Sequence, residues 1–376
     1  MEIPFNKPYI TSKEIENISK AIANGKLSGD GPFTGLVQKF MEERYGFKKT
    51  LLTTSCTDAL EMSAILANVN SDSEVIIPSY TFVSTANAFA LRGANIVFAD
   101  SEKLTPNIDV SKIESLITPR TKAIVVMHYA GIACDMGKVM EIASKYNLLV
   151  IEDAAQAIDA YYKDIPLGSI GALGTFSFHE TKNIIAGEGG LLSINNNDFL
   201  LRAEIIREKG TNRSQFFRGE IDKYGWIDIG SSFLASELIA AFLKGQLDYI
   251  DEIQRKRILI WERYAQNLGQ LKKNHPFLLP SIPEYASNNA HIFYLNCSNL
   301  EERIALMKYL GDKGIRTTFH YLSLHKSKFF GDLHDGRNLP ESDQWSNSIL
   351  RLPLYTELST SQVDKVSDAI LKFYHA

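Results

Sequence analysis

The chain has 376 residues, which is too long for a single hydrophobic core of ordinary size, so we expect two domains. Hydrophobic residues make up 45% of it and charged residues 22%, proportions that are typical of a globular protein. The net charge of −4 provides no electrostatic basis for binding nucleic acid or an anionic membrane surface.

The cysteines favour a reducing compartment. Cys56, Cys134 and Cys297 are widely spaced and form no Cys-x-x-Cys pair, so we expect neither a disulfide framework nor a metal site. The amino-terminal residues show no basic or apolar leader pattern, and no segment approaches the roughly 20 apolar residues that span a bilayer. We therefore expect a cytoplasmic protein with no membrane partner.

Short apolar segments alternate with amphipathic ones from residue 50 to residue 194. Several, such as Ala-Ile-Val-Val-Met at 123–127, are continuous and rich in β-branched residues, as in strands buried on both faces of a parallel sheet. The predicted strands are 50–54, 74–78, 95–99, 123–127, 148–152, 175–178 and 190–194. The predicted helices between them include 58–68, 82–92 and 136–146. This alternation predicts an α/β fold with a mostly parallel seven-stranded sheet and helices on both faces.

The remainder of the chain predicts a smaller α/β domain. A helical pattern begins near residue 236 and extends to about residue 271, either continuous or broken once. Beyond it we expect strands at 290–295 and 316–319, a helix at 300–313 and a last helix from residue 361. The predicted domains are residues 1–245, which include the amino-terminal segment, and residues 246–376.

Two segments that follow predicted strands are candidates for holding a ligand. Ser55-Cys-Thr-Asp-Ala-Leu60 opens a helix, so the amides of Thr57 and Asp58 and the Thr57 hydroxyl can bind a phosphate; the alternative is an ordinary helix N-cap. Phe82 lies beyond the carboxyl end of strand 74–78, where open α/β sheets place ligands. Its ring can stack on a flat ligand or, alternatively, fill the core.

An acid and a lysine indicate one cofactor. Asp153 ends a buried strand within Ile151-Glu-Asp-Ala-Ala-Gln156, where a carboxylate is costly unless a cation faces it. Lys182 follows the strand that carries Ser177. The pair suits pyridoxal 5′-phosphate (PLP), whose aldehyde bonds to a lysine and whose pyridine nitrogen stays protonated beside a carboxylate. Gln156, one helical turn after Asp153, can reach the ring hydroxyl, and Ser177 can donate to the phosphate.

Each of these residues also has an ordinary structural interpretation. Asp153 can be a hydrogen-bonded aspartate of the core, Gln156 a surface or core glutamine, and Lys182 a solvated lysine. It is their combination that favours the cofactor site.

The order of the motifs resembles the DegT/DnrJ/EryC1/StrS family, sugar aminotransferases of PLP fold type I. The motifs are Ser-x-Thr-x-Ala-Leu at 55–60, Glu-Asp-Ala-Ala-Gln at 152–156, Phe-Ser-x-x-x-x-Lys at 176–182 and Gly-Glu-Gly-Gly at 187–190, and the resemblance extends from Pro8 to Tyr355. It implies that the phosphate is held by Thr57, Asp58 and Ser177, that Phe82 stacks on the ring, and that Asp153, Gln156 and Lys182 meet the ring nitrogen, the ring hydroxyl and the aldehyde.

The resemblance also implies substrate contacts. The segment with His320 and Tyr321 matches one that lines the sugar site, although His320 by itself suits a core or surface histidine. Lys209 and Arg213 are candidates for the substrate pyrophosphate, or are surface charges. In many members a polar residue at the position of Ser232, or of its neighbour Ser231, contacts the cofactor phosphate in the active site of the neighbouring subunit. We therefore expect a homodimer with shared active sites. This chain lacks the arginine that those members carry there, and a loop N-cap is the alternative.

The stretches 207–213 and 228–232 resemble the members that form dTDP-4-amino-4,6-dideoxygalactose. The resemblance therefore implies that the substrates are L-glutamate and dTDP-4-keto-6-deoxyglucose, with amination at C4 to give an axial amine. Amination at C3, or of another nucleotide-linked ketosugar, is the alternative.

Three other functions share parts of this pattern. A nicotinamide dehydrogenase needs a Gly-x-Gly-x-x-Gly motif after a strand, and this sequence has none. A PLP-dependent sugar dehydratase of the same family carries histidine in place of the lysine, which here is Lys182. A non-catalytic relative that serves as a regulatory or binding protein does not need both Asp153 and Lys182. We therefore expect an enzyme.

Overall fold

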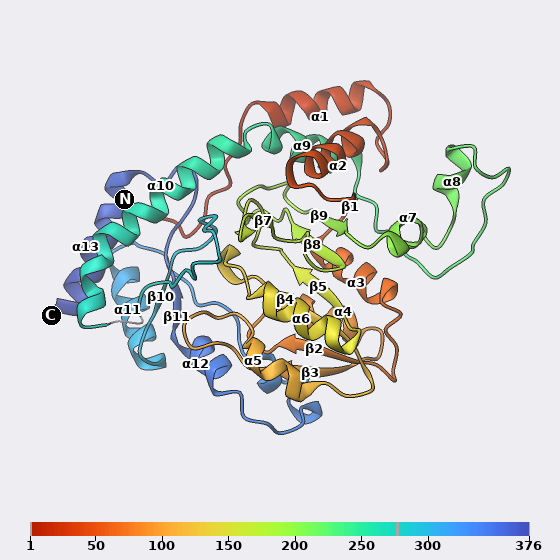
Figure 1. The fold of residues 1–376 in the computed structure, drawn as a ribbon. Helices are drawn as coiled ribbons and strands as arrows, with labels where there is room; N and C mark the ends of the chain where they lie inside the picture. Colours follow the sequence, from red (N-terminus) through yellow and green to blue (C-terminus); the bar gives the residue numbers. More distant parts are fainter. Residues whose placement is uncertain (1, 276–277, 376) are drawn as a thin grey trace.

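The computed structural model describes residues 2–275 and 278–375 and is built around one seven-stranded sheet (Figure 1). Its strand order is β1-β9-β8-β5-β4-β2-β3. The strands are β1 (Lys49–Thr53), β2 (Glu74–Pro78), β3 (Asn95–Ala99), β4 (Thr121–Met127), β5 (Leu149–Asp153), β8 (Leu173–Ser177) and β9 (Gly190–Ile194). β9 is antiparallel to both of its neighbours, β1 and β8, whereas the pairs from β8 through β3 are parallel. The prediction of a mostly parallel seven-stranded α/β sheet is confirmed.

The sheet is covered on both faces because its central strands carry buried apolar side chains on both sides. Ile76 and Ile124 belong to one hydrophobic cluster, whereas Val75 and Val125 belong to a second cluster on the opposite face. The helices that contribute to the first cluster include α2 (Pro32–Tyr45), α6 (Met136–Tyr146) and α9 (Glu237–Leu247). Three others contribute to the second: α3 (Cys56–Leu66), α4 (Val83–Ala90) and α7 (Leu200–Arg207).

The remaining helices frame this body. They are α1 (Lys13–Ala23), α5 (Val110–Ile113), α8 (Arg213–Phe217), α10 (Ile250–Leu268), α11 (Leu300–Asp312), α12 (Pro340–Ser348) and α13 (Thr360–His375). The segment that carries α8 projects away from the body as an arm, at the right of Figure 1. Among the described residues, no helix is both long and apolar enough to cross a membrane.

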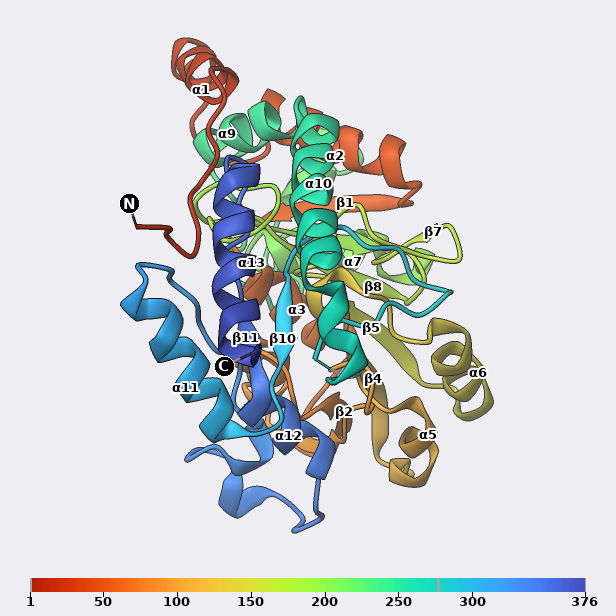
Figure 2. The same cartoon turned by 90° about the vertical axis from the view of Figure 1, so that its left-hand side faces the viewer.

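The predicted long helix is broken once, at Asp248 and Tyr249, into α9 and α10. The chain then builds a third hydrophobic cluster from α10, α11 and α13 around a two-stranded sheet of β10 (Tyr294–Asn296) and β11 (Ile349–Arg351) (Figure 2). A short hairpin of β6 (Tyr161–Tyr162) and β7 (Ile165–Pro166) lies outside both sheets. The division into domains at residues 245 and 246 stays a prediction.

The prediction of a strand at 316–319 is wrong. This segment makes only isolated bridges, Thr318 to Arg351 and, just before it, Ile315 to Ile3. Its backbone hydrogen bonds are shared with the amino-terminal segment, since the Arg316 amide donates to the Ile3 carbonyl at 3.0 Å. A partner from the far end of the chain replaces the regular strand ladder that local sequence suggested.

Candidate functional site

The polar side chains that could bind a cofactor or transfer a proton lie at one edge of the main sheet. β4, β5 and β8 end at this edge, and α3 and α4 begin there, because parallel strands direct their carboxyl ends and the following helix amino termini to the same side. Asp153 is the last residue of β5, Ser177 is the last of β8, and Lys182 follows β8 by five residues.

Asp153 is buried, with 4% of its surface exposed. Its carboxylate accepts hydrogen bonds from the Thr85 hydroxyl at 2.7 Å and from the Ala155 amide at 3.1 Å. Burial raises the pKa of Asp153, against the opposing effect of these two donors. No Lys, Arg or His side chain of the described residues pairs with it within 4 Å, so a cationic N–H placed against this carboxylate would be strongly favoured.

The donor Thr85 lies in the first turn of α4, and Phe82 is the residue that caps this helix. The Thr85 amide also donates to the Phe82 carbonyl at 3.1 Å. Phe82 keeps 52% of its surface exposed, and its ring centroid lies 5.9 Å from that of Tyr321. The start of α4 therefore couples an exposed aromatic ring to the buried carboxylate of Asp153.

At the start of α3, Ser55 is the N-cap, and its hydroxyl accepts from the Asp58 amide at 3.0 Å. Within the described residues the amides of Cys56 and Thr57, the first two of the helix, have no acceptor and are available to an anion, whereas the Asp58 amide already donates to Ser55. The Thr57 hydroxyl donates to Ser84 at 2.8 Å, and the Asp58 carboxylate accepts from the Thr54 hydroxyl. Burial, reinforced by nearby Glu61, raises the pKa of Asp58 to about 6.

Gly190 brings Ser177 next to this helix start. Ser177 and Gly190 face each other across the β8–β9 ladder. A Cβ atom on Gly190 would lie 2.2 Å from the Ser55 carbonyl carbon, so only glycine allows β9 to pass this close to α3. The Ser177 hydroxyl and the first amides of α3 therefore lie at a shared anion cradle.

Lys182 is half-buried and lines a small cavity together with His291, His320 and Arg351. Burial lowers the pKa of Lys182, the Asp153 carboxylate opposes this, and the positive charge of Arg351 lowers it further. An amine with a lowered pKa is more readily deprotonated, which is the form needed by a nucleophile or a general base.

Two separate groups of hydrogen bonds lie on the far side of the site. The Gln156 side chain accepts from the Ala130 amide at 2.6 Å and donates to the Tyr321 hydroxyl at 2.8 Å. The Tyr129 hydroxyl meets His320 Nδ1 at 2.9 Å. Burial lowers the pKa of His320, so it is neutral at pH 7. The structure therefore brings Gln156, His320 and Tyr321 together.

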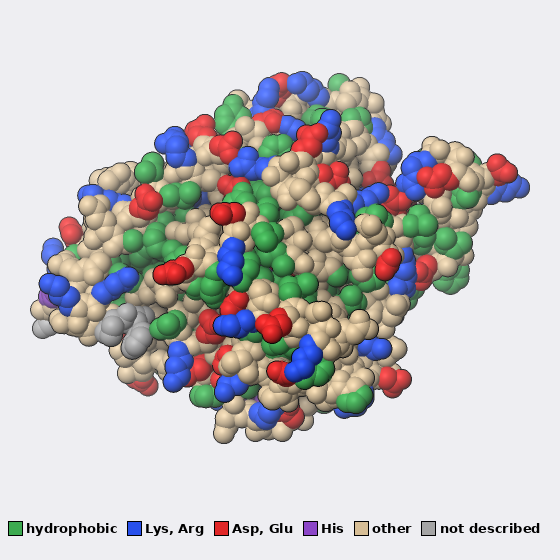
Figure 3. All heavy atoms as spheres, in the orientation of Figure 1, with side chains coloured by type: hydrophobic (Ala, Val, Ile, Leu, Met, Phe, Trp, Pro, Cys, Tyr) green, Lys and Arg blue, Asp and Glu red, His purple; other side chains and the backbone are tan. Residues whose placement is uncertain are grey.

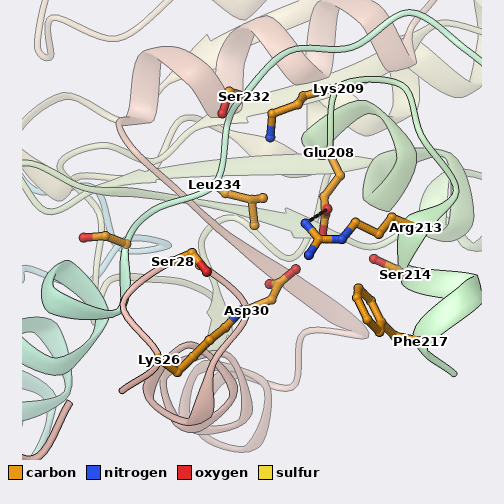
Figure 4. Close-up of a pocket in the computed structure, with 12 residues that line it drawn as sticks. Lys26, Ser28, Asp30, Glu208, Lys209, Arg213, Ser214, Phe217, Ser232 and Leu234 are labelled. Carbon is orange, nitrogen blue, oxygen red and sulfur yellow. Dashed lines mark ion pairs between the residues drawn. The ribbon is translucent and has the colours of Figure 1, made fainter. Parts of the chain in front are cut away.

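Lys209, Arg213 and Ser232 lie elsewhere. They line a second pocket of about 570 Å³, near the base of the arm that carries α8 (Figure 4). In this pocket Arg213 Nη1 lies 3.5 Å from the Glu208 carboxylate. None of its lining residues also lines the cavity at Lys182. The predicted substrate residues are therefore divided between two places within one chain.

Sequence reasoning missed a buried pair directly behind Asp153. His128 accepts from the Cys134 amide at Nδ1, so its Nε2 carries the proton and donates to Glu152 at 3.0 Å. The Glu152 carboxylate also accepts from three backbone amides between residues 168 and 171, at 2.6–2.8 Å. It thereby ties β5 to the loop that enters β8. The only signal in the sequence was an acidic residue inside a strand.

These features together fit PLP. The buried carboxylate of Asp153 suits a pyridine N–H, the cradle of α3 and Ser177 suits a phosphate, and Lys182 suits an aldehyde. The pyridine nitrogen, the phosphate and the aldehyde of PLP therefore each have a chemically suitable partner at the same edge of the sheet.

Comparison with known proteins agrees with this chemistry. The model of the DegT/DnrJ/EryC1/StrS aminotransferase family matches residues 8–371. The crystal structure of the aminotransferase TlmJ from Streptoalloteichus hindustanus is 28% identical, with a TM-score of 0.91 over 100% of this chain and 99% of that chain. A DegT DnrJ EryC1 StrS aminotransferase from Brucella abortus is 26% identical, with a TM-score of 0.87 over 97% and 96%. Spr1654 from Streptococcus pneumoniae, in its PLP form, shares the fold at 24% identity, with a TM-score of 0.90 over 100% and 99%.

Proposed function

We propose a specific reaction for this chain, which belongs to the DegT/DnrJ/EryC1/StrS aminotransferase family and is a PLP-dependent enzyme. It transfers the amino group of L-glutamate to C4 of dTDP-4-keto-6-deoxy-D-glucose. The products are dTDP-4-amino-4,6-dideoxy-D-galactose and 2-oxoglutarate. The observation that carries the aminotransferase chemistry is the position of Lys182 and Asp153 at one sheet edge, beside the anion cradle at the start of α3.

In this proposal each residue of the sheet edge has one task toward the cofactor. The amides of Thr57 and Asp58 and the Ser177 hydroxyl bind the phosphate; Asp58 shares its amide with Ser55. Phe82 covers one face of the ring. Asp153 accepts from the pyridine N–H and so keeps that nitrogen protonated, while Gln156 approaches the ring hydroxyl.

When bound, PLP supplies the aldehyde carbon and the electron-withdrawing ring that make the donor's Cα proton acidic. The Lys182 amine removes this proton as a general base. Its lowered pKa supports this role, because the neutral amine is present at a lower pH than for a solvated lysine. In the second half of the reaction the same amine delivers a proton to C4 of the sugar. The face of the sugar that meets Lys182 decides whether the new amine is axial.

The remaining predicted residues bind the substrate and the cofactor phosphate. His320 and Tyr321 lie beside Gln156 and contact the sugar, with neutral His320 able to donate or accept at a hydroxyl. Lys209 and Arg213 bind the pyrophosphate of the substrate, and Ser232 reaches the phosphate of the cofactor. Because these three line a pocket apart from Lys182, we propose that they serve the active site of a second subunit in a homodimer.

The arm that carries α8 supports this assembly. It exposes Phe217, Trp226 and Ile227, with 67%, 83% and 56% of their surface accessible, and Figure 3 shows apolar side chains gathered on it. Large exposed apolar side chains on a projecting segment are typical of an interface. We place the enzyme in the cytoplasm, where its three free, buried cysteines stay reduced. We also retain the division into domains at 1–245 and 246–376.

Two measurements test this function. Borohydride reduction of the PLP-loaded protein, followed by peptide mapping, should place a single pyridoxyl adduct on Lys182. Incubation with L-glutamate and dTDP-4-keto-6-deoxyglucose, followed by NMR of the product, should show an axial amine at C4. A 3-amino sugar would overturn the substrate assignment and leave the cofactor chemistry intact. Absence of any adduct would identify a non-catalytic relative.

A further inference from the structure

Arg351 is a cation that has no carboxylate partner among the described residues. It ends β11, and no acidic side chain of the described residues lies within 4 Å of its guanidinium. Within the described part of the chain, the guanidinium makes one hydrogen bond, a long one from Nη2 to the Phe319 carbonyl at 3.5 Å, and its Nε is buried with no acceptor. The guanidinium lies 4.8 Å from the centroid of the Phe5 ring, a contact that leaves its hydrogen-bond donors unused.

This unpaired cation lines the same cavity as Lys182. The other residues that line it are Phe5, Asn6, Thr181, His291, Ile292, His320, Leu352 and Leu354. None of the ten is acidic. Burial lowers the pKa of both His291 and His320, so these imidazoles are neutral at pH 7, and Arg351 is the cavity's permanent charge. A partly enclosed cavity that has a fixed guanidinium and no acidic side chain in its lining attracts a small anion.

The size of the cavity limits what that anion can be. Its volume is about 60 Å³, which is room for a carboxylate but not for a nucleotide diphosphate. The pocket of about 570 Å³ that holds Lys209 and Arg213 is large enough for a diphosphate. A group that shares this small cavity with Lys182 must also lie within a few bonds of the carbon at which Lys182 acts.

We propose that Arg351 binds the α-carboxylate of the amino donor. This carboxylate is bonded directly to the carbon whose proton Lys182 removes, so both groups must fit in one small cavity. A guanidinium can hold a carboxylate through two parallel N–H···O bonds, which would fix the orientation of the Cα–H bond. The inference rests on the proposed aminotransferase function and adds the specificity-determining residue for the amino acid.

The test separates the two halves of the reaction. The PLP-loaded enzyme is mixed with L-glutamate alone, and conversion is followed by loss of the visible absorbance of the cofactor. Arg351→Met retains an apolar stem beside Phe5, and it should raise the glutamate concentration for half-maximal rate by about 10- to 100-fold. Arg351→Lys should recover part of this loss. Arg316→Met, which removes an exposed arginine paired with Glu2, is the matched control and should change nothing.

Two further readouts distinguish a carboxylate site from general damage. Arg351→Met should not slow the reaction with a primary amine that lacks a carboxylate, because that donor makes no use of the guanidinium. Calorimetry with glutarate, an unreactive dicarboxylate, should show binding to the wild type and at least tenfold weaker binding to Arg351→Met. This readout does not depend on turnover, and a melting curve of each variant checks that it is folded.

Three outcomes overturn the inference. They are an unchanged glutamate requirement in Arg351→Met, an equal loss with the carboxylate-free amine, and a loss confined to the reaction with the nucleotide sugar. Failure of the proposed function looks different, because the wild type itself would then fail to react with glutamate or would yield a sugar aminated at another carbon.

Discussion

The Thr85 hydroxyl donates a 2.7 Å hydrogen bond to the buried Asp153 carboxylate, and this bond joins the start of α4 to the end of β5. Phe82 begins the same helix, so the position of its exposed ring depends on the aspartate. A PLP site needs a carboxylate that faces the ring nitrogen and an aromatic side chain that covers the ring. The bond between Thr85 and Asp153 fixes the positions of both.

Replacing Thr85 by valine tests that coupling. Thr85→Val keeps the side-chain shape but leaves Asp153 with the Ala155 amide as its remaining donor. We expect the free energy of unfolding to fall by about 1–2 kcal/mol, and the affinity for PLP to fall with it. Denaturant unfolding and a PLP titration measure the two effects. Thr85→Ser retains the hydroxyl and should behave as the wild type; equal losses in both variants would exclude the hydrogen bond as the cause.

Asp153→Asn should have opposite effects on stability and on activity. Burial raises the pKa of Asp153 above its ordinary value, so at neutral pH ionisation of this carboxylate opposes folding. That cost is absent below the ordinary pKa of an aspartate, grows as the pH rises from that value to the raised pKa of the folded state, and is constant above it. We therefore expect the cofactor-free variant to melt at a higher temperature than the wild type at pH 7.5, with the difference shrinking toward pH 4. Turnover should fall by about 10²-fold or more, because the amide cannot stabilise a protonated pyridine nitrogen.

Asp58 gives the site a pH-dependent affinity for phosphate. Its pKa of about 6 means that it is ionised at pH 7.5 and neutral at pH 5. At pH 7.5 the ionised carboxylate repels an anion at the start of α3, so Asp58→Asn should bind PLP a few-fold more tightly than the wild type. At pH 5 the two proteins should bind equally. Titration at both pH values checks this, and a constant ratio would show that the carboxylate does not act on the phosphate.

Gly190→Ala should damage the phosphate cradle. The added Cβ would lie 2.2 Å from the Ser55 carbonyl carbon, so β9 or the start of α3 must move. We expect a loss of about 1–3 kcal/mol in the free energy of unfolding and weaker PLP binding. Gly189→Ala is the matched control, because its Cβ would meet only side-chain carbons at 3.5 Å, an ordinary contact. A similar loss in both variants would show that the loss comes from reduced backbone flexibility and not from the contact with Ser55.

The arm should hold the dimer together. Trp226→Glu places a charge on a side chain that is 83% exposed on the arm, and we expect the mass in solution to fall from dimer to monomer. Loss of turnover should accompany it if Lys209, Arg213 and Ser232 serve the second subunit. Leu259→Glu, at a 54% exposed leucine on α10, is the control and should leave the assembly unchanged. Light scattering after gel filtration measures the mass of each variant.

Much of the main sheet was predictable because its strands are specified locally. β2, β3 and β9 begin and end at the predicted residues, and the others differ by one or two positions at either end. A strand that is buried on both faces needs a continuous apolar run, which is visible in the sequence without knowledge of its partners. By contrast, the segment 316–319 has the composition of a strand, but its partners come from Ile3 and Arg351, so its form depends on distant contacts.

The candidate site shows the same division. The sequence alone determined which chemistry is available, because Asp153 and Ser177 end recognisable strands, Lys182 follows shortly after one, and parallel strands bring such ends together. Only the tertiary structure decided that Arg351 shares a cavity with Lys182, that Thr85 holds Asp153, and that Lys209 and Arg213 lie in a separate pocket. The physical reason is that strand and helix patterns are short-range properties of the chain. Which charged side chains meet from distant parts of the chain depends on how complete elements pack, and no local pattern records it.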